Sequence, residues 1–295
     1  MQPIKKRGLS DAQIGIVLIL PALAVFATII LYPFINSIFM SFTNRSMLKP
    51  EADIVGFANY IKVFSDPYFL GTILNTAILV VGSTLIPFTL GFIWAVVLNQ
   101  KFRGSEFIRG VTLVNWIIPG TAIGFLWLWI FNGEYGILNG LLSSLGLIDK
   151  NIPWLSQRGT AMFVVIIART WQMLPWYMAF LMGGLQGVSY DQIEAARIDG
   201  ANNWQVFRHV VLPSMSTLIG TILILGTIGS LQHFDLPWVM TEGGPARATT
   251  TLSIEVYRTA FKNWDLGRAA TVGTIWAILL AVFSFVYLRK VNDSE

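Results

Sequence analysis

Glu194-Ala195-Ala196-Arg197-Ile198-Asp199-Gly200-Ala201 is a short polar stretch that lies between long apolar runs. Ser189 and Gln192 have the spacing of a capping box, which predicts a helix that begins at Tyr190. Gly200 suits the position just past the end of that helix, where a left-handed backbone costs glycine little. A second short helix is predicted over residues 203–211. The pattern alone leaves two interpretations open, an amphipathic hairpin on a membrane surface and a docking site for a soluble partner.

The composition around this stretch is that of an integral membrane protein. The chain has 295 residues, of which 54% are hydrophobic and 12% charged, whereas a soluble domain carries about 25% charged residues. The net charge of +4 is modest and argues against nucleic acid as a partner. The sequence has no cysteine and two separated histidines, so it predicts neither disulfides nor a metal site.

Six apolar runs are long enough to span a bilayer, which takes about 20 residues as a helix. The sequence therefore predicts an all-α polytopic membrane protein with six transmembrane helices. The predicted spans are residues 14–38, 73–98, 107–131, 160–183, 217–240 and 269–288. Residues 1–13 and 289–295 are predicted tails, and residues 188–213 form the polar loop between the fourth and fifth spans. Prolines inside the runs, Pro119 among them, predict kinks.

Basic clusters next to the spans predict the orientation of the chain. Lys5, Lys6 and Arg7 precede the first span, and Lys101, Arg103 and Arg109 crowd the short loop after the second. Arg289 and Lys290 follow the last span. The clusters predict that both termini and the 194–201 stretch are cytoplasmic, although the opposite loops hold nearly as many basic residues.

The polar stretch resembles the EAA loop of ABC importer permeases, together with Phe207 and Leu212-Pro213 at the same offsets. In that family the loop is the coupling helix, which sits in a cleft of the ATP-hydrolysing subunit. The resemblance implies docking by Ala195, Ala196 and Gly200 and polar anchoring by Glu194 and Asp199. The complete set of residues that it assigns to ATPase coupling is Glu194, Ala195, Ala196, Asp199, Gly200, Ala201, Phe207 and Pro213.

Loop motifs resemble the carbohydrate-uptake branch of the same family, the permeases for maltose, trehalose or glycerol phosphate. They are Gly56-Phe57-x-Asn59-Tyr60, Gly136-x-Leu138-Asn139 and Gly243-Gly244-Pro245 followed by Thr249-Thr250-Thr251-Leu252. The resemblance covers residues 14–288. It implies the type I importer permease fold in the inner membrane of a prokaryote.

Catalytic motifs are missing from the sequence, including the phosphate loop of ATPases. The resemblance implies that the chain is a translocation subunit rather than an enzyme, importing a sugar of the di- or oligosaccharide class. The implied partners are a second permease, two ATPase subunits that hold ATP and magnesium, and an extracytoplasmic sugar-binding protein, besides membrane lipid. The alternative hypothesis is an ion-coupled secondary carrier that needs no ATPase, with Arg169 and Asp235 as its charge relay.

Polar and aromatic residues at bilayer depth indicate a path, because buried polar groups are costly there unless they serve the interior. The resemblance to maltose-type permeases maps substrate contacts onto Gln172, Met173, Trp176, Ser230 and His233. The aromatic residues and His233 are also compatible with plain packing. Arg169 falls near the midplane and requires a partner, for which Asp235 is a candidate.

Overall fold

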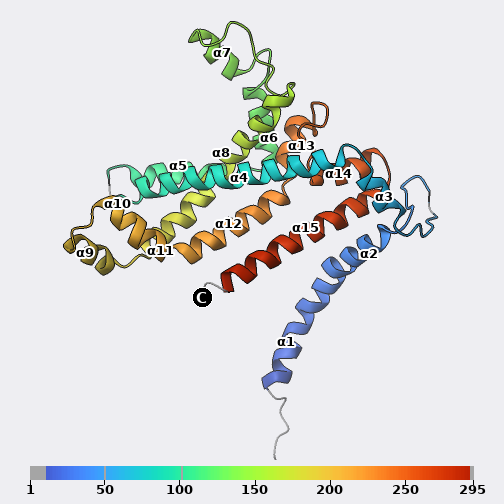
Figure 1. Cartoon of the computed structure of the whole chain (residues 1–295), viewed down its shortest axis with the longest axis horizontal. Helices are drawn as coiled ribbons and strands as arrows, with labels where there is room; N and C mark the ends of the chain where they lie inside the picture. The colour runs from blue at the N-terminus through green and yellow to red at the C-terminus, as the bar shows by residue number, and fades with distance from the viewer. Residues whose placement is uncertain (1–10, 50, 101, 293–295) are drawn as a thin grey trace, which may run out of the picture.

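The computed structural model describes residues 11–49, 51–100 and 102–292, and this part of the chain is helical without a named strand (Figure 1). The predicted tail at residues 1–13 and the end of the tail at 289–295 fall largely outside the described residues, as does Lys101. In chain order the elements are α1 (Asp11–Phe26), η1 (Ala27–Leu31), α2 (Tyr32–Met40), α3 (Ala58–Phe64), α4 (Phe69–Leu98), α5 (Ser105–Ile117), α6 (Gly120–Ile130), α7 (Ile137–Ser144), α8 (Arg158–Gln186), α9 (Tyr190–Ile198), α10 (Asn203–Val206), η2 (Phe207–Val211), α11 (Leu212–Ser214), α12 (Ser216–Leu231), α13 (Asp235–Thr241), α14 (Leu252–Tyr257), η3 (Arg258–Lys262) and α15 (Leu266–Asn292).

Four continuous helical segments are long and apolar enough to cross a membrane, and two bent pairs raise the number to six. The four segments are Ile14–Met40, Phe69–Leu98, Arg158–Gln186 and Leu266–Tyr287. The pairs are Ser105–Ile117 with Gly120–Ile130 and Asn203–Ser214 with Ser216–Leu231. The predicted all-α membrane fold is therefore confirmed, while two of its spans are not straight helices.

The third apolar run bends by 100° between α5 and α6. Ile118 and Pro119 are extended there, with ψ of 131° and 139°. A residue before proline is pushed out of the helical region, and proline itself is well suited to a helix start. The kink expected at Pro119 is thus a full break, whereas α4 and α8 continue through Pro87 and Pro175.

The fifth predicted run, residues 217–240, is not one helix. Helix α12 ends at Leu231 and α13 begins at Asp235. Pro237 has no N–H for the carbonyl of His233 one helical turn before it, and that carbonyl instead accepts a hydrogen bond from the Ser253 hydroxyl at 3.1 Å. The break places Gln232 and His233 in a short non-helical connection.

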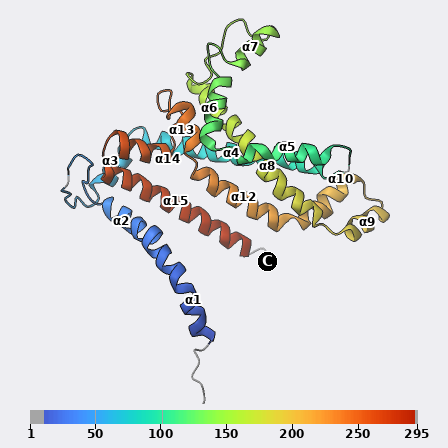
Figure 2. The ribbon, with the colours of Figure 1, turned by 180° about the vertical axis from the view of Figure 1, so that it is seen from behind.

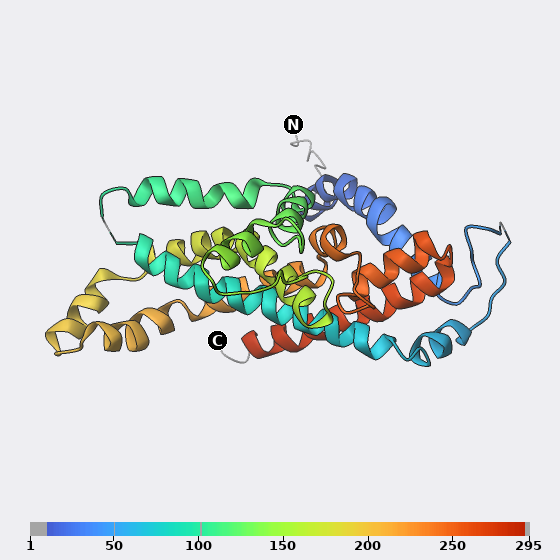
Figure 3. The ribbon, with the colours of Figure 1, turned by 90° about the horizontal axis from the view of Figure 1, so that it is seen from above.

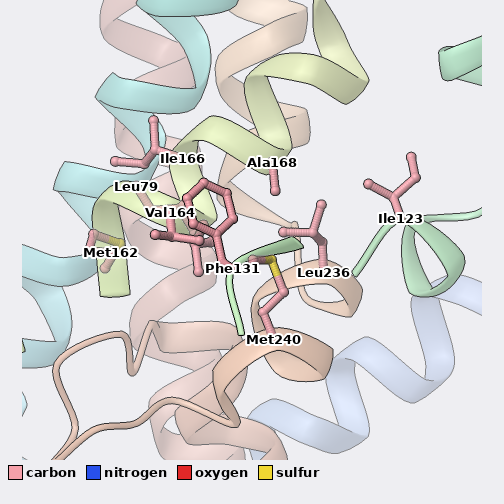
Figure 4. Packing of buried hydrophobic residues seen from close by; sticks show 10 residues of the cluster. Leu79, Ile123, Phe131, Met162, Val164, Ile166, Ala168, Leu236 and Met240 are labelled. Atoms are coloured by element: carbon pink, nitrogen blue, oxygen red, sulfur yellow. The ribbon is translucent and has the colours of Figure 1, made fainter. Parts of the chain in front are cut away.

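Helices α4 and α8 pack along each other and form the centre of the bundle. Their contact continues into a buried apolar cluster that includes Leu79, Val164, Ile166 and Leu236 (Figure 4). Gly91 lets the two helices approach closely, because a Cβ at this position would lie 2.8 Å from Tyr177 Cβ and 3.0 Å from the Met178 backbone nitrogen. Small residues have this role in helix contacts within membranes.

We expect Gly91→Ala to lower the free energy of unfolding by about 1–3 kcal/mol, since the added methyl group overpacks a backbone contact. Gly71→Ala on the same helix is the matched control, because a Cβ there meets no atom within 4 Å. Thermal unfolding of the purified chain in detergent measures the difference. Equal unfolding midpoints for both variants would contradict the close approach.

The two ends of the bundle differ in construction (Figures 1 and 3). Helices α9 and α10 project from one end, and the end that carries α3 and α14 is a cap of loops tied by hydrogen bonds. Asn75 of α4 donates to the carbonyls of Arg247 and Thr250 at 2.9 and 3.2 Å, and Thr76 accepts from the Leu252 N–H at 2.9 Å. The cap therefore joins residues far apart in the sequence.

The first membrane-length helical segment is the least integrated part of the described chain. The apolar window of Ile14–Met40 has none of its residues buried inside the chain. Its contact with the bundle runs through α2, which packs against α15, while α1 extends away (Figure 2). An apolar helix without packing partners faces lipid or another protein.

Candidate functional site

Residues 188–213 form a protruding elbow at the α9 end of the bundle (Figure 3). Helix α9 begins at Tyr190 as the sequence predicts, but Ser189 makes no side-chain capping bond. The capping box is instead at the second helix, where Asn202 accepts from the Gln205 N–H at 2.9 Å and the Gln205 side chain accepts from the Asn202 N–H at 2.8 Å. The second helix is thereby fixed at its start.

Gly200 shapes the turn of the elbow. Its φ is +87°, in the left-handed region that favours glycine. The Gly200 N–H donates to the Arg197 carbonyl at 3.0 Å, and the Ala201 N–H donates to the Ala196 carbonyl at 2.9 Å. These bonds satisfy carbonyls at the end of α9 and reverse the chain.

The residues assigned to coupling by resemblance fall into an outer and an inner group. Glu194, Ala195, Asp199, Gly200 and Pro213 are exposed. Ala196, Ala201 and Phe207 pack inward against the buried cluster around Tyr177. A shallow hollow of about 370 Å³ brings Ala196, Asp199, Gly200 and Ala201 together with Gln205 and His209. Glu194, Ala195 and Pro213 lie outside the lining of this hollow.

Phe207 connects the elbow to the bundle. Its ring lies 5.7 Å from that of Phe92 on α4 and 5.8 Å from that of Trp204, measured between centroids. Phe92 in turn stacks near Phe88, which meets Tyr177 of α8 edge-on at 5.9 Å. This continuous aromatic row joins the elbow to the central helix pair.

The five residues assigned to substrate contact differ in burial, and none of them is fully exposed at the bundle surface. Gln172 and Ser230 are buried, with Ser230 Oγ accepting from the Thr84 hydroxyl at 3.3 Å. Met173, Trp176 and His233 are half-buried. Trp176 packs on Phe180, with ring centroids 4.8 Å apart. The set therefore combines two inner polar groups with three side chains nearer the surface.

Arg169 lies on α8 at 7% exposure, and its Nη1 donates to Gln172 Oε1 at 2.6 Å. The salt bridges of the described chain are Arg247–Glu255 and Arg268–Asp66. Arg169 is therefore not paired with Asp235, contrary to the candidate pair from the sequence. A residue three positions further along the same helix faces the same side, so Gln172 can reach the guanidinium without any tertiary rearrangement.

A second polar hollow of about 480 Å³ lies at the cap end, between α13 and η3. Arg247, Arg258, Lys262 and Glu242 line it, three basic residues with one acidic residue. Arg247 pairs with Glu255 at 2.7 Å, and Lys262 Nζ lies 5.8 Å from the centroid of Trp238. Arg247, Arg258 and Lys262 are among the basic residues of the loops opposite the predicted cytoplasmic clusters. Nothing local in the sequence predicts that they line one hollow, because their proximity depends on η3 lying beside α13.

Comparisons with known proteins agree with this geometry. Residues 87–294 match the family described as "Binding-protein-dependent transport system inner membrane component", and this range includes the elbow. The chain is 32% identical over 279 residues to the trehalose/maltose transport system permease protein of Thermococcus litoralis, covering 95% of this chain and 94% of that protein. It is 30% identical over 288 residues to the sulfoquinovosyl glycerol transport system permease protein of Agrobacterium fabrum, covering 97% of this chain and 93% of that protein.

Among solved structures, a chain of a bacterial ABC transporter that imports the acidic polysaccharide alginate has the same fold. The TM-score is 0.82 at 19% identity, with 95% of each chain covered. A chain of the methionine ABC transporter in an inward-facing conformation is more distant, with a TM-score of 0.57 at 16% identity, covering 78% of this chain and 99% of that one.

Proposed function

The chain belongs to the family of binding-protein-dependent transport system inner membrane components, and from this premise we propose that it is a membrane-spanning subunit of an ATP-driven importer for a sugar. The observation that carries the proposal is the family match, which extends over both the elbow and the central helices. The sugar is proposed from the trehalose/maltose and sulfoquinovosyl glycerol systems of the two relatives.

In the proposed mechanism, the ATPase subunits bind the elbow, and when the two ATPase subunits close on each other the elbow moves the helix bundle. The exposed face of α9 offers Ala195 and Gly200 for close approach, with Glu194 and Asp199 as polar anchors. The aromatic row from Phe207 to Tyr177 carries the movement to α4 and α8. ATP and magnesium are held by those partner subunits, and the elbow end is cytoplasmic.

A second permease chain is proposed as the partner that completes the path. What supports it is the first membrane-length segment, whose apolar residues find no packing inside this chain. The sugar path then lies where the two chains meet. Trp176 supplies an aromatic face for the C–H side of a sugar ring. Gln172, Met173, Ser230 and His233 complete the proposed contacts.

The ion-coupled carrier is the disfavoured alternative. Family membership links the chain to a binding-protein-dependent system. The charge relay that the carrier needs is also not formed, because Arg169 donates to Gln172 rather than pairing with Asp235.

The proposed function is tested by reconstituting the chain in liposomes with its second permease, ATPase and binding-protein partners. We expect uptake of labelled disaccharide that requires both ATP and the binding protein, and that unlabelled sugars of the right class compete. Uptake that persists without the ATPase subunits, driven by an ion gradient, would overturn the proposal in favour of the carrier.

The basic hollow at the cap end is proposed as a contact for acidic side chains of the binding protein. We expect Lys262→Glu to raise the binding-protein concentration for half-maximal ATPase by about tenfold, because a charge reversal in a complementary patch slows association. Lys49→Glu is the matched control, an exposed lysine of the same end that does not line the hollow. An equal shift for both variants, or no shift for Lys262→Glu at low salt, contradicts this contact.

A further inference from the structure

A hollow at the α9 end is used neither by the elbow nor by the proposed sugar path. It has a volume of about 820 Å³ and lies between the end of α4, the first turn of α5 and the end of α8. Asn99, Arg103, Ser105, Arg109 and Gln186 are among its lining residues. The ends of three helices thus meet around one polar space.

Hydrogen-bond donors of the chain converge on this hollow. Helix α5 has 13 residues and begins after Gly104, whose φ is +94° and which provides no side-chain cap. The first N–H groups of a helix have no intrahelical acceptor, and the helix dipole favours an anion beside them. The Ser105 N–H already donates to the Phe102 carbonyl at 3.2 Å, so the amides available at this helix start are those of Glu106 and Phe107. Ser105 is only 6% exposed, and it lines the hollow. Its hydroxyl is not one of the fully buried side-chain atoms that lack a partner, so it is a second donor that remains accessible at the start of the helix.

Two guanidinium groups add positive charge. Arg109 is held in place because its Nε donates to the Leu98 carbonyl at 3.2 Å and its Nη2 donates to the same oxygen. Arg103 is exposed and takes part in neither salt bridge of the described chain. Glu106 also lines the hollow and opposes these charges, so the described residues of the lining carry two arginines and one glutamate, a net charge of one positive unit.

The outer flank of the hollow is apolar. Phe107 is 77% exposed and Val111, one helical turn further along α5, is 53% exposed. In a chain whose helices cross a bilayer, such side chains face acyl chains while the helix start lies at headgroup depth. An apolar flank beside phosphate donors fits a phospholipid better than a free phosphate ion.

We propose that this hollow binds the phosphate of an anionic phospholipid from the cytoplasmic leaflet, with Ser105, the first amides of α5 and Arg103 as its donors. The leaflet rests on the proposed function, which places the α9 end in the cytoplasm. Basic pockets between membrane helices on that side are suited to acidic headgroups. The bound lipid bridges the ends of α4, α5 and α8.

The test measures lipid retention by the assembled transporter in nanodiscs. Spin-labelled phosphatidylglycerol and phosphatidylcholine are compared by the fraction of probe that the protein immobilises. We expect preferential immobilisation of phosphatidylglycerol, weakened on the order of fivefold by Arg103→Gln, as removal of one basic charge near the surface predicts. Ser105→Ala, which leaves the charge unchanged, also lowers retention. Arg289→Gln, an exposed cation near the end of α15, is the control and retains the lipid.

Two outcomes would overturn the lipid site. One is equal immobilisation of both lipids, and the other is complete displacement of phosphatidylglycerol by millimolar inorganic phosphate, which would assign the hollow to a free anion. Sugar uptake measured in parallel keeps the two proposals apart. Loss of ATP-driven uptake with selective lipid retention intact contradicts the import function alone, whereas ATP-driven uptake with no lipid preference contradicts the lipid site alone.

Discussion

Gly200→Val is expected to reduce both sugar-stimulated ATP hydrolysis and uptake by at least about tenfold, while the bundle stays folded. The φ of +87° at Gly200 is strained for any side chain, and a β-branched residue is the least tolerant of it. The cost of the left-handed conformation is about 1–2 kcal/mol for an ordinary residue. No residue of α9 is buried, and only its inner side packs on the cluster around Tyr177, through residues that include Ala196, so α9 has little packing to oppose this strain.

Gly200→Asn is the matched control for the elbow, because asparagine visits the left-handed region far more readily than valine. We expect it to keep uptake within about twofold, since the backbone turn survives. Both variants are assayed in the complete reconstituted complex, and thermal unfolding of the purified chain checks that the bundle is intact. Full activity of Gly200→Val would show that the turn does not transmit the movement of the ATPase.

Local sequence signals were sufficient to predict the elbow. The start of α9 at Tyr190, the left-handed Gly200 and the second helix from Asn203 all depend on residues within a few positions of one another. The capping box was nevertheless predicted at the wrong helix. The spacing of Ser189 and Gln192 is suitable, but the side chain of Ser189 does not bond the helix start, whereas Asn202 and Gln205 do.

The membrane spans were predictable for a different reason, because a helix that crosses a bilayer needs a long run of mostly apolar residues. The bends within these spans were harder to predict. Pro119 indicated a kink but not its size of 100°. The break in the fifth run could not be predicted locally either, because the His233 carbonyl that Pro237 leaves without a donor is satisfied by the hydroxyl of Ser253, 20 positions after His233. The cap bonds of Asn75 join residues 172 and 175 positions apart, and no local pattern announces them.

The partner of Arg169 is the sharpest failure of the sequence argument. An unpaired charge at bilayer depth demanded a counter-charge, and Asp235 was available on the neighbouring segment. The guanidinium instead donates from Nη1 to Gln172 within the same helix, while its Nε has no partner among the described residues. Helical position made Gln172 a possible acceptor, but burial of both side chains depends on how α8 packs, which the sequence does not reveal locally.

We therefore expect Gln172→Leu to lower the free energy of unfolding by about 1–3 kcal/mol, because it leaves the buried Arg169 guanidinium without its hydrogen-bond acceptor. The double variant Arg169→Met with Gln172→Leu removes both members, and replacing a buried polar pair with apolar residues of similar volume is often close to neutral. The double variant should accordingly be more stable than the single Gln172→Leu variant.

Denaturant unfolding of the purified chain in mixed micelles compares the three proteins, with Asp235→Asn as the control. Asp235 forms no salt bridge within the described chain, so its neutralisation should change stability by less than about 1 kcal/mol, as is usual for a side chain outside such a network. A large loss of stability in Asp235→Asn, with little loss in Gln172→Leu, would show that Arg169 is stabilised by an ion pair with Asp235 and not by its hydrogen bond to Gln172.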